Sequence, residues 1–221
     1  MNDALELRAA RHAALGDPVR LAIVDELAVS DRAPVEIRRR VGIESNLLAH
    51  HLDVLAEVGL IHRSRSSGDG RRRYVHLLRD AFDTVGTRPM VRARPALFVC
   101  TQNSARSQLA AALWREITHE PAASAGTHPA DRVHPDAVEA ARRAHLELDA
   151  TGPRALASLD RIPDLVVTVC DQAYEELDAP DGWLHWSVLD PVPVGTKAAF
   201  DDVVAELRDR IRSVTELRGA A

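Results

Sequence analysis

Apolar residues in the first eighty positions recur every three or four residues, which is the period of an amphipathic α-helix. Asp17 and Pro18 supply an N-cap and a first helical residue, and Gly42 and Gly59 are suited to end helices. Two β-branched or aromatic segments follow, joined by the turn residues Ser-Ser-Gly-Asp-Gly. The pattern therefore predicts helices over 3–15, 19–28, 35–41 and 44–58, and strands over 60–63 and 73–77.

Helices separated by a glycine turn and followed by a two-stranded hairpin are the order of a winged helix-turn-helix domain, whose last helix enters the major groove. We expect early residues of that helix to face base edges, and the hairpin arginines to bind phosphates. The alternative for His50 and His51 is an ordinary exposed pair on a helix. The predicted DNA contacts are Ser45, Asn46, Ala49, His50, His51, Arg63, Arg65, Arg71, Arg72 and Arg73.

The charge distribution supports a polyanionic partner for this half of the chain. Residues 1–94 carry 16 arginines and 13 acidic residues, a net charge of +3, whereas residues 95–221 carry 12 basic and 20 acidic residues, a net charge of −8. Overall the net charge is −5. The first part is therefore the one suited to contact DNA.

Three segments, ALGDPVR (14–20), HLDVL (51–55) and VGLI (58–61), resemble the ArsR/SmtB family of metal-sensing repressors. The resemblance covers about residues 5–80 and implies a homodimer on double-stranded operator DNA. Many arsenic sensors of that family bind inducer through cysteines near residues 33–37, which here read APVEI, so a cysteine site of that type is absent. His12, Asp3 and Glu6 share the first helix and leave open a histidine and carboxylate site of the kind that other members use. Surface solvation is the favoured role for them, and we predict no metal site.

The second half alternates short apolar strands with helices, a pattern typical of an α/β domain with a parallel sheet. Strands are predicted near 96–100, 122–127 and 164–169, and helices from about 107 onward and near 135–146, 154–159 and 200–217. Ligands of such sheets gather beyond the carboxyl ends of the strands, where Cys100 and Cys170 both lie. We expect domains over 1–80 and 95–221, with a linker over 81–94 whose first residues form a helical turn.

The segment between the first of these strands and its helix is the strongest chemical signal. Successive backbone N–H groups of Thr101, Gln102, Asn103, Ser104, Ala105 and Arg106 can surround an oxyanion at the head of a helix. A helix N-terminus and a guanidinium favour the thiolate of Cys100, and Arg106 offers two parallel donors. Ser107 can donate to the thiolate, and Asn103 tolerates positive φ. The alternative is that Cys100 is a buried core cysteine.

The spacing C-x5-R-S after a strand resembles the low-molecular-weight protein tyrosine phosphatase family, and CTQNSARSQ (100–108) resembles its arsenate reductase branch. The resemblance implies a nucleophile at Cys100, an oxyanion held by the loop and Arg106, and a general acid far downstream. Asp190, before Pro191, is the predicted acid. Phosphatases usually carry glycine where this chain has Gln102.

Cys170, Leu177 and the segment 192–194 bear on the substrate. Cys170 resembles the second cysteine of thioredoxin-linked arsenate reductases, whereas Leu177 stands where a third is expected, so either a disulfide relay ends at Cys100 and Cys170 or a small thiol takes over. The tyrosines common in phosphotyrosine-specific members are replaced by VPV (192–194), which disfavours phosphotyrosine.

The leading hypothesis is a DNA-binding regulator fused to an arsenate reductase that binds no cofactor and uses an external thiol donor, thioredoxin or a small thiol. The alternatives are a non-catalytic oxyanion sensor and a low-molecular-weight phosphatase. No apolar run approaches the roughly 20 residues of a membrane helix, and the charged, helical start does not resemble a secretory signal. We therefore expect a cytoplasmic protein.

Overall fold

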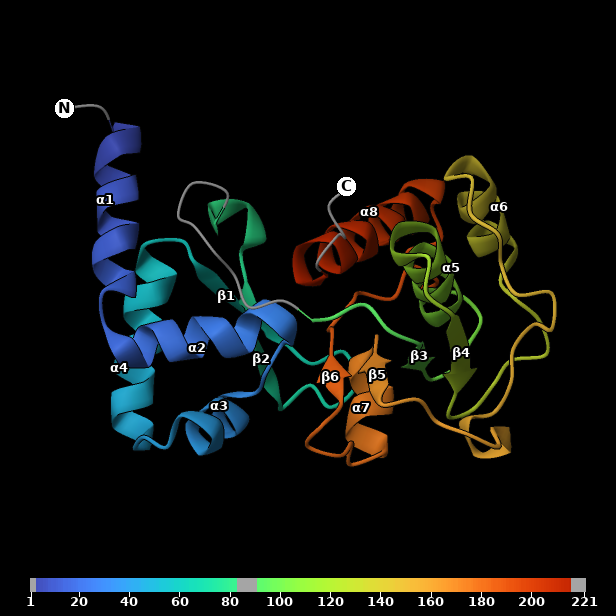
Figure 1. The fold of residues 1–221 in the computed structure, drawn as a ribbon, viewed down its shortest axis with the longest axis horizontal. Helices are drawn as coiled ribbons and strands as arrows, with labels where there is room; N and C mark the ends of the chain where they lie inside the picture. Colours follow the sequence, from blue (N-terminus) through green and yellow to red (C-terminus); the bar gives the residue numbers. More distant parts are fainter. Residues whose placement is uncertain (1–2, 83–90, 216–221) are drawn as a thin grey trace. The chain divides into compact units, whose positions relative to one another are not determined.

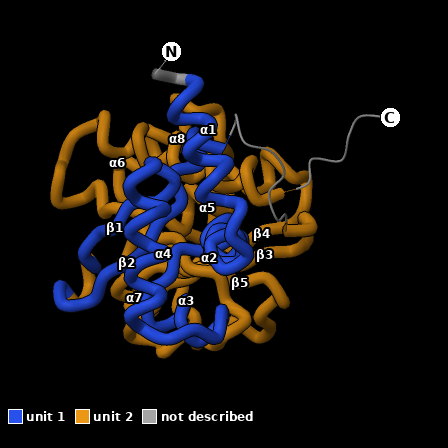
Figure 2. Tube along the Cα trace, turned by 90° about the vertical axis from the view of Figure 1, so that its left-hand side faces the viewer, with its two compact units in different colours: residues 1–66, 70–90 blue, residues 67–69, 91–221 orange. Residues whose placement is uncertain are grey.

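The computed structural model describes residues 3–82 and 91–215 (Figure 1). Contacts divide the chain into two compact units, residues 1–66 with 70–90, and residues 67–69 with 91–221 (Figure 2). Most of the predicted linker, residues 83–90, lies outside the described residues; its start overlaps a 3-10 turn, Arg79–Phe82. Among the described residues, no helix is long and apolar enough to cross a membrane.

Besides the 3-10 turn, the described part of the first unit contains four α-helices and a hairpin: α1 (Asp3–Leu15), α2 (Pro18–Val29), α3 (Pro34–Val41), α4 (Ser45–Glu57), β1 (Ile61–Arg65) and β2 (Arg73–Leu77). The predicted boundaries agree within two residues because local signals set them. Asp17 Oδ1 accepts from the backbone N–H groups of Val19 and Arg20, and Gly42 ends α3 at φ 73°. Ile23, Leu27, Ile37, Leu55 and Leu60 form the fully buried centre of this unit.

The second unit is built on a four-stranded parallel sheet in the order β4-β3-β5-β6. Its strands are β3 (Ala96–Cys100), β4 (Ala122–Gly126), β5 (Leu165–Thr168) and β6 (Leu184–His185). Every residue of β3 is buried, as expected of a central parallel strand covered on both faces. The predicted fold class, a helical winged helix-turn-helix domain followed by an α/β domain with a parallel sheet, is confirmed.

Helices pack against this sheet and one another: α5 (Arg106–Thr118), α6 (Pro135–Arg143), α7 (Asp171–Glu176) and α8 (Lys197–Val214). The long helix α8 packs on α5 and α6, as Figure 1 shows, and α7 packs on β3 and β5. The order of elements places the end of β3, the start of α5 and the start of α7 at the same edge of the sheet.

Some expected boundaries were wrong. α8 begins at Lys197 rather than near residue 200, because Thr196 accepts from the backbone N–H of Ala199 and caps it; its expected end at 217 lies outside the described residues. The helix expected over 154–159 is a 3-10 turn, Leu156–Ser158. α7 and β6 were not predicted, since helices of six residues and strands of two are too short to show a period.

Candidate active site

Cys100 lies at the end of β3, directly before the loop that leads into α5. Its side chain is 3% exposed, its Sγ accepts from the backbone N–H of Asn103 at 3.2 Å, and Ser107 Oγ lies 3.1 Å away. Ala105 at the N-cap position has no side-chain oxygen, so the N–H groups at the start of α5 are not capped by it. This arrangement suits an anion at the helix N-terminus, next to the sulfur.

The cavity over this loop has a volume of about 70 Å³. That is the scale of a small inorganic ion, well below the hundreds of cubic ångströms of organic-ligand pockets. Its lining residues are Cys100, Thr101, Gln102, Ser104, Ala105, Arg106, Gln172, Asp190 and Val192. The cavity therefore brings most of the predicted oxyanion-binding residues together.

Asn103 holds the loop in shape from below. It is fully buried at φ 51°; its Nδ2 donates to Ser107 Oγ at 2.8 Å, and its Oδ1 accepts from the backbone N–H of Arg154 at 2.9 Å. Gln108 Nε2, also buried, lies 3.3 Å from the same Oδ1. The predicted left-handed conformation of Asn103 is confirmed, and its amide additionally orients the hydroxyl that faces the sulfur.

The segment after β4 fixes the outer side of the loop. Backbone N–H groups of Thr127, His128, Ala130 and His134 donate to the carbonyl groups of Cys100, Thr101, Gln102 and Ser104 at 2.8–3.1 Å. Gly126 permits this close approach, because a Cβ there would lie 2.6 Å from the Thr101 carbonyl oxygen. With its carbonyl groups occupied in this way, the loop is held rigidly before any ligand binds.

Arg106 and Asp190 meet above the loop although 84 residues separate them. Arg106 is 8% exposed; its Nη1 donates to the Val188 carbonyl oxygen and its Nη2 to Asp190 Oδ2, both at 2.9 Å. Asp190 Oδ1 accepts from the backbone N–H of Val192 at 3.1 Å. The predicted acid thus lies at the mouth of the predicted anion site, fixed from both sides.

Cys170 follows β5 and caps α7, so both cysteines lie at the ends of neighbouring strands, as expected. The Cys170 side chain is 1% exposed, and its Sγ is 3.4 Å from both Thr101 Oγ1 and the backbone nitrogen of Ala173. Burial raises the pKa of the Cys170 thiol and the charge of nearby Cys100 raises it further, against the opposing effects of Arg106 and Thr101. The second sulfur is accordingly held as a neutral thiol beside the loop.

Three residues of the site were not predicted: Gln172 and Val192, which line the cavity, and Gln108, which supports Asn103. Gln172 comes two residues after Cys170, so the rule that placed Cys170 at the sheet edge could have found it. Val192 was noted only as a replacement for tyrosine. Nothing in the local sequence marks Gln108 as buried support.

In the first unit, four predicted DNA contacts on α4 (Ser45, Asn46, Ala49 and His50) and all five arginines of the hairpin are exposed. Arg63 Nη2 donates to Asp53 Oδ1 at 2.8 Å. The placement of His51 on this surface was wrong, since it is 6% exposed and its Nδ1 lies 3.9 Å from Asp17 Oδ1. The burial of Leu48, Leu52 and Leu55 shows why, because His51 shares their side of the helix.

No group of three or more histidine, cysteine or acidic side chains in the described ranges could hold a metal ion. The described residues include His12 and Glu6 of the first helix, the positions where the sequence left a carboxylate and histidine site open.

Comparison with known proteins gives one match in each of the two units. Residues 96–218 match the family "Low molecular weight phosphotyrosine protein phosphatase", and residues 15–64 match "Helix-turn-helix domain". The predicted recognition of an ArsR-type DNA-binding domain fused to a phosphatase-like domain is confirmed. No curated protein sequence matches the chain.

Similar solved structures cover the second unit. They include a YwlE mutant from Bacillus subtilis (25% identity, TM-score 0.48, 54% of this chain and 95% of that one). An arsenate reductase from Archaeoglobus fulgidus is 26% identical with a TM-score of 0.45, covering 53% and 95%. A low molecular weight protein tyrosine phosphatase from Bacillus subtilis is 26% identical with a TM-score of 0.47, covering 54% and 93%.

The predicted enzyme class, which joined thiol-dependent arsenate reductases and low-molecular-weight phosphatases, is also confirmed. More than half of the chain lies within the matched family segment, and the cysteine, the arginine and the loop between them all fall inside it. A helix-turn-helix domain precedes that segment. Because the match covers more than half of the chain, the chain belongs to the low molecular weight phosphotyrosine protein phosphatase family.

Proposed function

We propose that the second unit reduces arsenate to arsenite with electrons from thiols, and that the first unit is a repressor that binds operator DNA. The observation that carries this proposal is the second buried thiol beside the anion loop. Cys170 Sγ lies 3.4 Å from Thr101 Oγ1, and Cys100 is near enough for its charge to raise the pKa of Cys170. Hydrolysis of a phosphate ester needs a single cysteine, Cys100, whereas reduction needs a second thiol that attacks the sulfur of the first.

In the first step arsenate occupies the loop, and its oxygens accept from backbone N–H groups and Arg106. The Cys100 thiolate attacks arsenic and forms an S–As bond, while the As–O bond to one hydroxyl group of the arsenate breaks and that hydroxyl leaves as water after receiving a proton from Asp190. Arg106 already contacts Asp190 Oδ2 at 2.9 Å, so the acid lies next to the group that binds the oxyanion. Asp190 has to be protonated for this step, and the incoming arsenate competes with it for the guanidinium.

In the second step Cys170 loses its proton and attacks Cys100 Sγ. The S–S bond forms as the S–As bond breaks, and the electron pair of the broken bond reduces arsenic(V) to arsenic(III), which leaves as arsenite. Bonding of Cys100 to arsenic removes the thiolate charge that helps to raise the pKa of Cys170. An external thiol, thioredoxin or a small thiol, then reduces the Cys100–Cys170 disulfide.

A phosphatase of this family shares the first step but uses water in the second, so the two activities separate at Cys170. The test is to measure arsenite release with a thiol donor and, in parallel, hydrolysis of p-nitrophenyl phosphate. We expect Cys100→Ser to lose at least about 1,000-fold in both reactions. Cys170→Ser should lose at least about 100-fold in arsenite release while keeping hydrolysis within about threefold.

Arsenite release by Cys170→Ser at the wild-type rate, both with thioredoxin and with a small thiol as the donor, would reject the disulfide step. A wild-type protein that hydrolyses the aryl phosphate but releases no arsenite would assign the unit as a phosphatase. Ser158→Ala, an exposed substitution in the 3-10 turn of the same unit, is the control for handling and stability.

The regulatory half of the proposal is a cytoplasmic homodimer that binds double-stranded operator DNA through α4 and the hairpin. A non-catalytic sensor remains the competing hypothesis, and it differs in its need for an acid. In a gel-shift titration, a repressor whose release from DNA depends on turnover responds to arsenate as the wild type but not as Asp190→Ala. Arsenite added directly releases the DNA from both proteins. A sensor that responds to arsenate binding alone would respond in both proteins.

A further inference from the structure

The first unit contains a cavity of about 540 Å³ bounded by α3, α4 and the hairpin. Leu48, Leu52 and Val75 are its buried floor, with 4%, 3% and 0% of their surface exposed. Pro34, Val35 and Ala49 add apolar walls, and Val35 is 50% exposed. The volume and the mainly apolar lining are those of a site for a small organic molecule.

The rim of this cavity is cationic. Arg38, Arg63 and Arg73 line it, and no aspartate or glutamate does so among the described residues that form it. Arg38 Nη1 donates to Ser45 Oγ at 3.1 Å and Arg63 Nη2 to Asp53 Oδ1 at 2.8 Å, so these two guanidinium groups are anchored while further N–H donors remain on each. Asp53 offsets the positive charge of Arg63 but lies outside the lining of the cavity.

We propose that this cavity binds a small amphipathic organic anion, with an aromatic or branched hydrocarbon body on the leucine floor and a carboxylate or sulfonate at the arginine rim. Burial of the hydrocarbon supplies most of the binding free energy. The guanidinium groups select for negative charge and orient the acid group.

The position of the cavity links this ligand to DNA binding. Ser45, Ala49, Arg63 and Arg73 line the cavity and are also predicted DNA contacts. A bound anion occupies the arginines that phosphates require, so the ligand and DNA compete for the same groups and binding of either one excludes the other. DNA phosphates alone satisfy the arginines but leave the hydrocarbon floor unfilled. This inference does not depend on the chemistry of the second unit.

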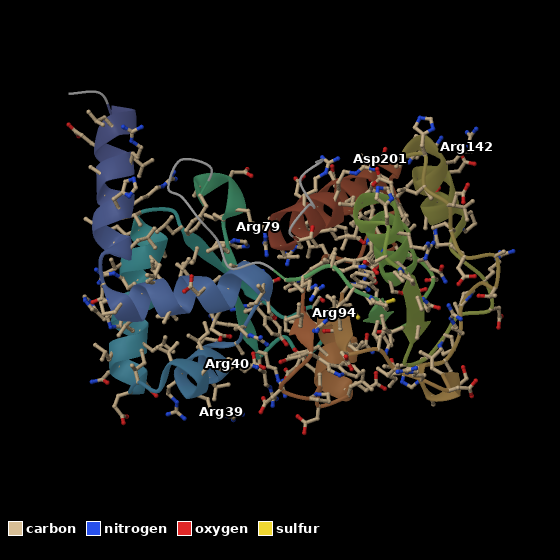
Figure 3. The ribbon with its side chains drawn as sticks, in the orientation of Figure 1. Arg39, Arg40, Arg79, Arg94, Arg142 and Asp201 are labelled. Atoms are coloured by element: carbon tan, nitrogen blue, oxygen red, sulfur yellow. The ribbon has the colours of Figure 1, made fainter. Side chains whose placement is uncertain are left out.

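The test uses 1-anilinonaphthalene-8-sulfonate, an aromatic anion whose fluorescence rises in apolar sites, added to the full chain with inorganic phosphate saturating the Cys100 loop. We expect saturable binding of one molecule per chain. Arg73→Gln should weaken it at least fivefold, and Val35→Trp, which fills the cavity, should weaken it at least tenfold. Arg39→Gln is the matched control. Arg39, labelled in Figure 3, follows the cavity residue Arg38 on α3, and it is exposed but does not line the cavity.

Two further measurements complete the test. The neutral analogue N-phenyl-1-naphthylamine should bind at least fivefold more weakly than the sulfonate, and a labelled DNA duplex should be displaced by the sulfonate in proportion to its occupancy. The proposal is overturned if Arg73→Gln leaves sulfonate binding unchanged, or if the neutral analogue binds equally well. It is also overturned if sulfonate and duplex bind together. Since Arg73 is exposed, its variant decides the matter even if Val35→Trp does not fold.

Discussion

Arginine is exposed over the predicted DNA surface of the first unit and buried at the oxyanion loop of the second. The five hairpin arginines all face solvent, whereas Arg106 is 8% exposed with both Nη atoms bonded. Exposed guanidinium groups contribute charge, which salt screens and lysine can replace. A buried, doubly bonded guanidinium contributes geometry, which lysine cannot copy. The same residue type therefore has two functions, distinguished by burial.

The cavities differ in the same way. The loop cavity has about 70 Å³ and is surrounded by backbone and polar groups, whereas the cavity of the first unit has about 540 Å³ and a leucine floor. A small, polar, rigid cavity suits an inorganic oxyanion at a reacting sulfur, and a large apolar one suits an organic body. The two cavities therefore suit chemically distinct ligands.

The largest effect is expected from Arg106→Lys. Lysine cannot contact both the Val188 carbonyl and two oxygens of a bound oxyanion, so we expect kcat/KM to fall at least about 100-fold. Arg72→Lys in the exposed hairpin is the matched substitution, and its DNA affinity should change by less than about threefold. Steady-state kinetics and fluorescence anisotropy measure the two. Equal small effects would abolish the distinction between buried and exposed arginines.

Two asparagines, buried Asn103 and exposed Asn46, extend the comparison of buried and exposed side chains. Asn103→Ala removes a fully buried amide with several hydrogen bonds, so thermal or urea unfolding should show a loss of about 1–3 kcal/mol, with activity reduced at least tenfold. Asn46→Ala on the exposed start of α4 should leave stability within about 0.5 kcal/mol but weaken DNA binding. A stability loss confined to Asn46→Ala would contradict the assignment.

Salt dependence tests the exposed side alone. Each arginine among Arg71, Arg72 and Arg73 that contacts a phosphate should, when replaced by glutamine, lower the slope of log affinity against log salt by about 0.9. The change is measured by anisotropy on a labelled duplex between low and high salt. Slopes that are identical in all variants would remove the hairpin from the interface.

The smallest effect concerns pH and Cys170. Because burial and the charge of Cys100 raise the pKa of Cys170 in the folded chain, the unfolded chain loses this proton first as pH rises past the ordinary thiol pKa of about 8.5. The stabilisation is complete below that value and declines above it, by at most about 1.4 kcal/mol per pH unit. Urea unfolding between pH 7 and 10 should show a shallower alkaline decline in Cys170→Ala. An identical decline would assign it to other groups.

The sequence alone identified the helix boundaries of the first unit, the loop from Cys100 to Arg106 and the hairpin, because each depends on neighbours in the chain. Caps such as Asp17 and Gly42 act within a few residues, and the oxyanion loop is one continuous strand-loop-helix segment. Asp190 and Cys170 were found through family resemblance and the rule for strand ends, without any means of measuring their separation from the loop.

Tertiary structure alone decided which side chains meet. The contact of Arg106 with Asp190 spans 84 residues, and the carbonyl groups of the loop are held by residues 127–134, which local periodicity cannot reveal. The burial of His51 and the cavity between α3, α4 and the hairpin likewise depend on how elements pack. Chain neighbours determine backbone conformation, but packing between distant elements determines which of these residues can act on one ligand.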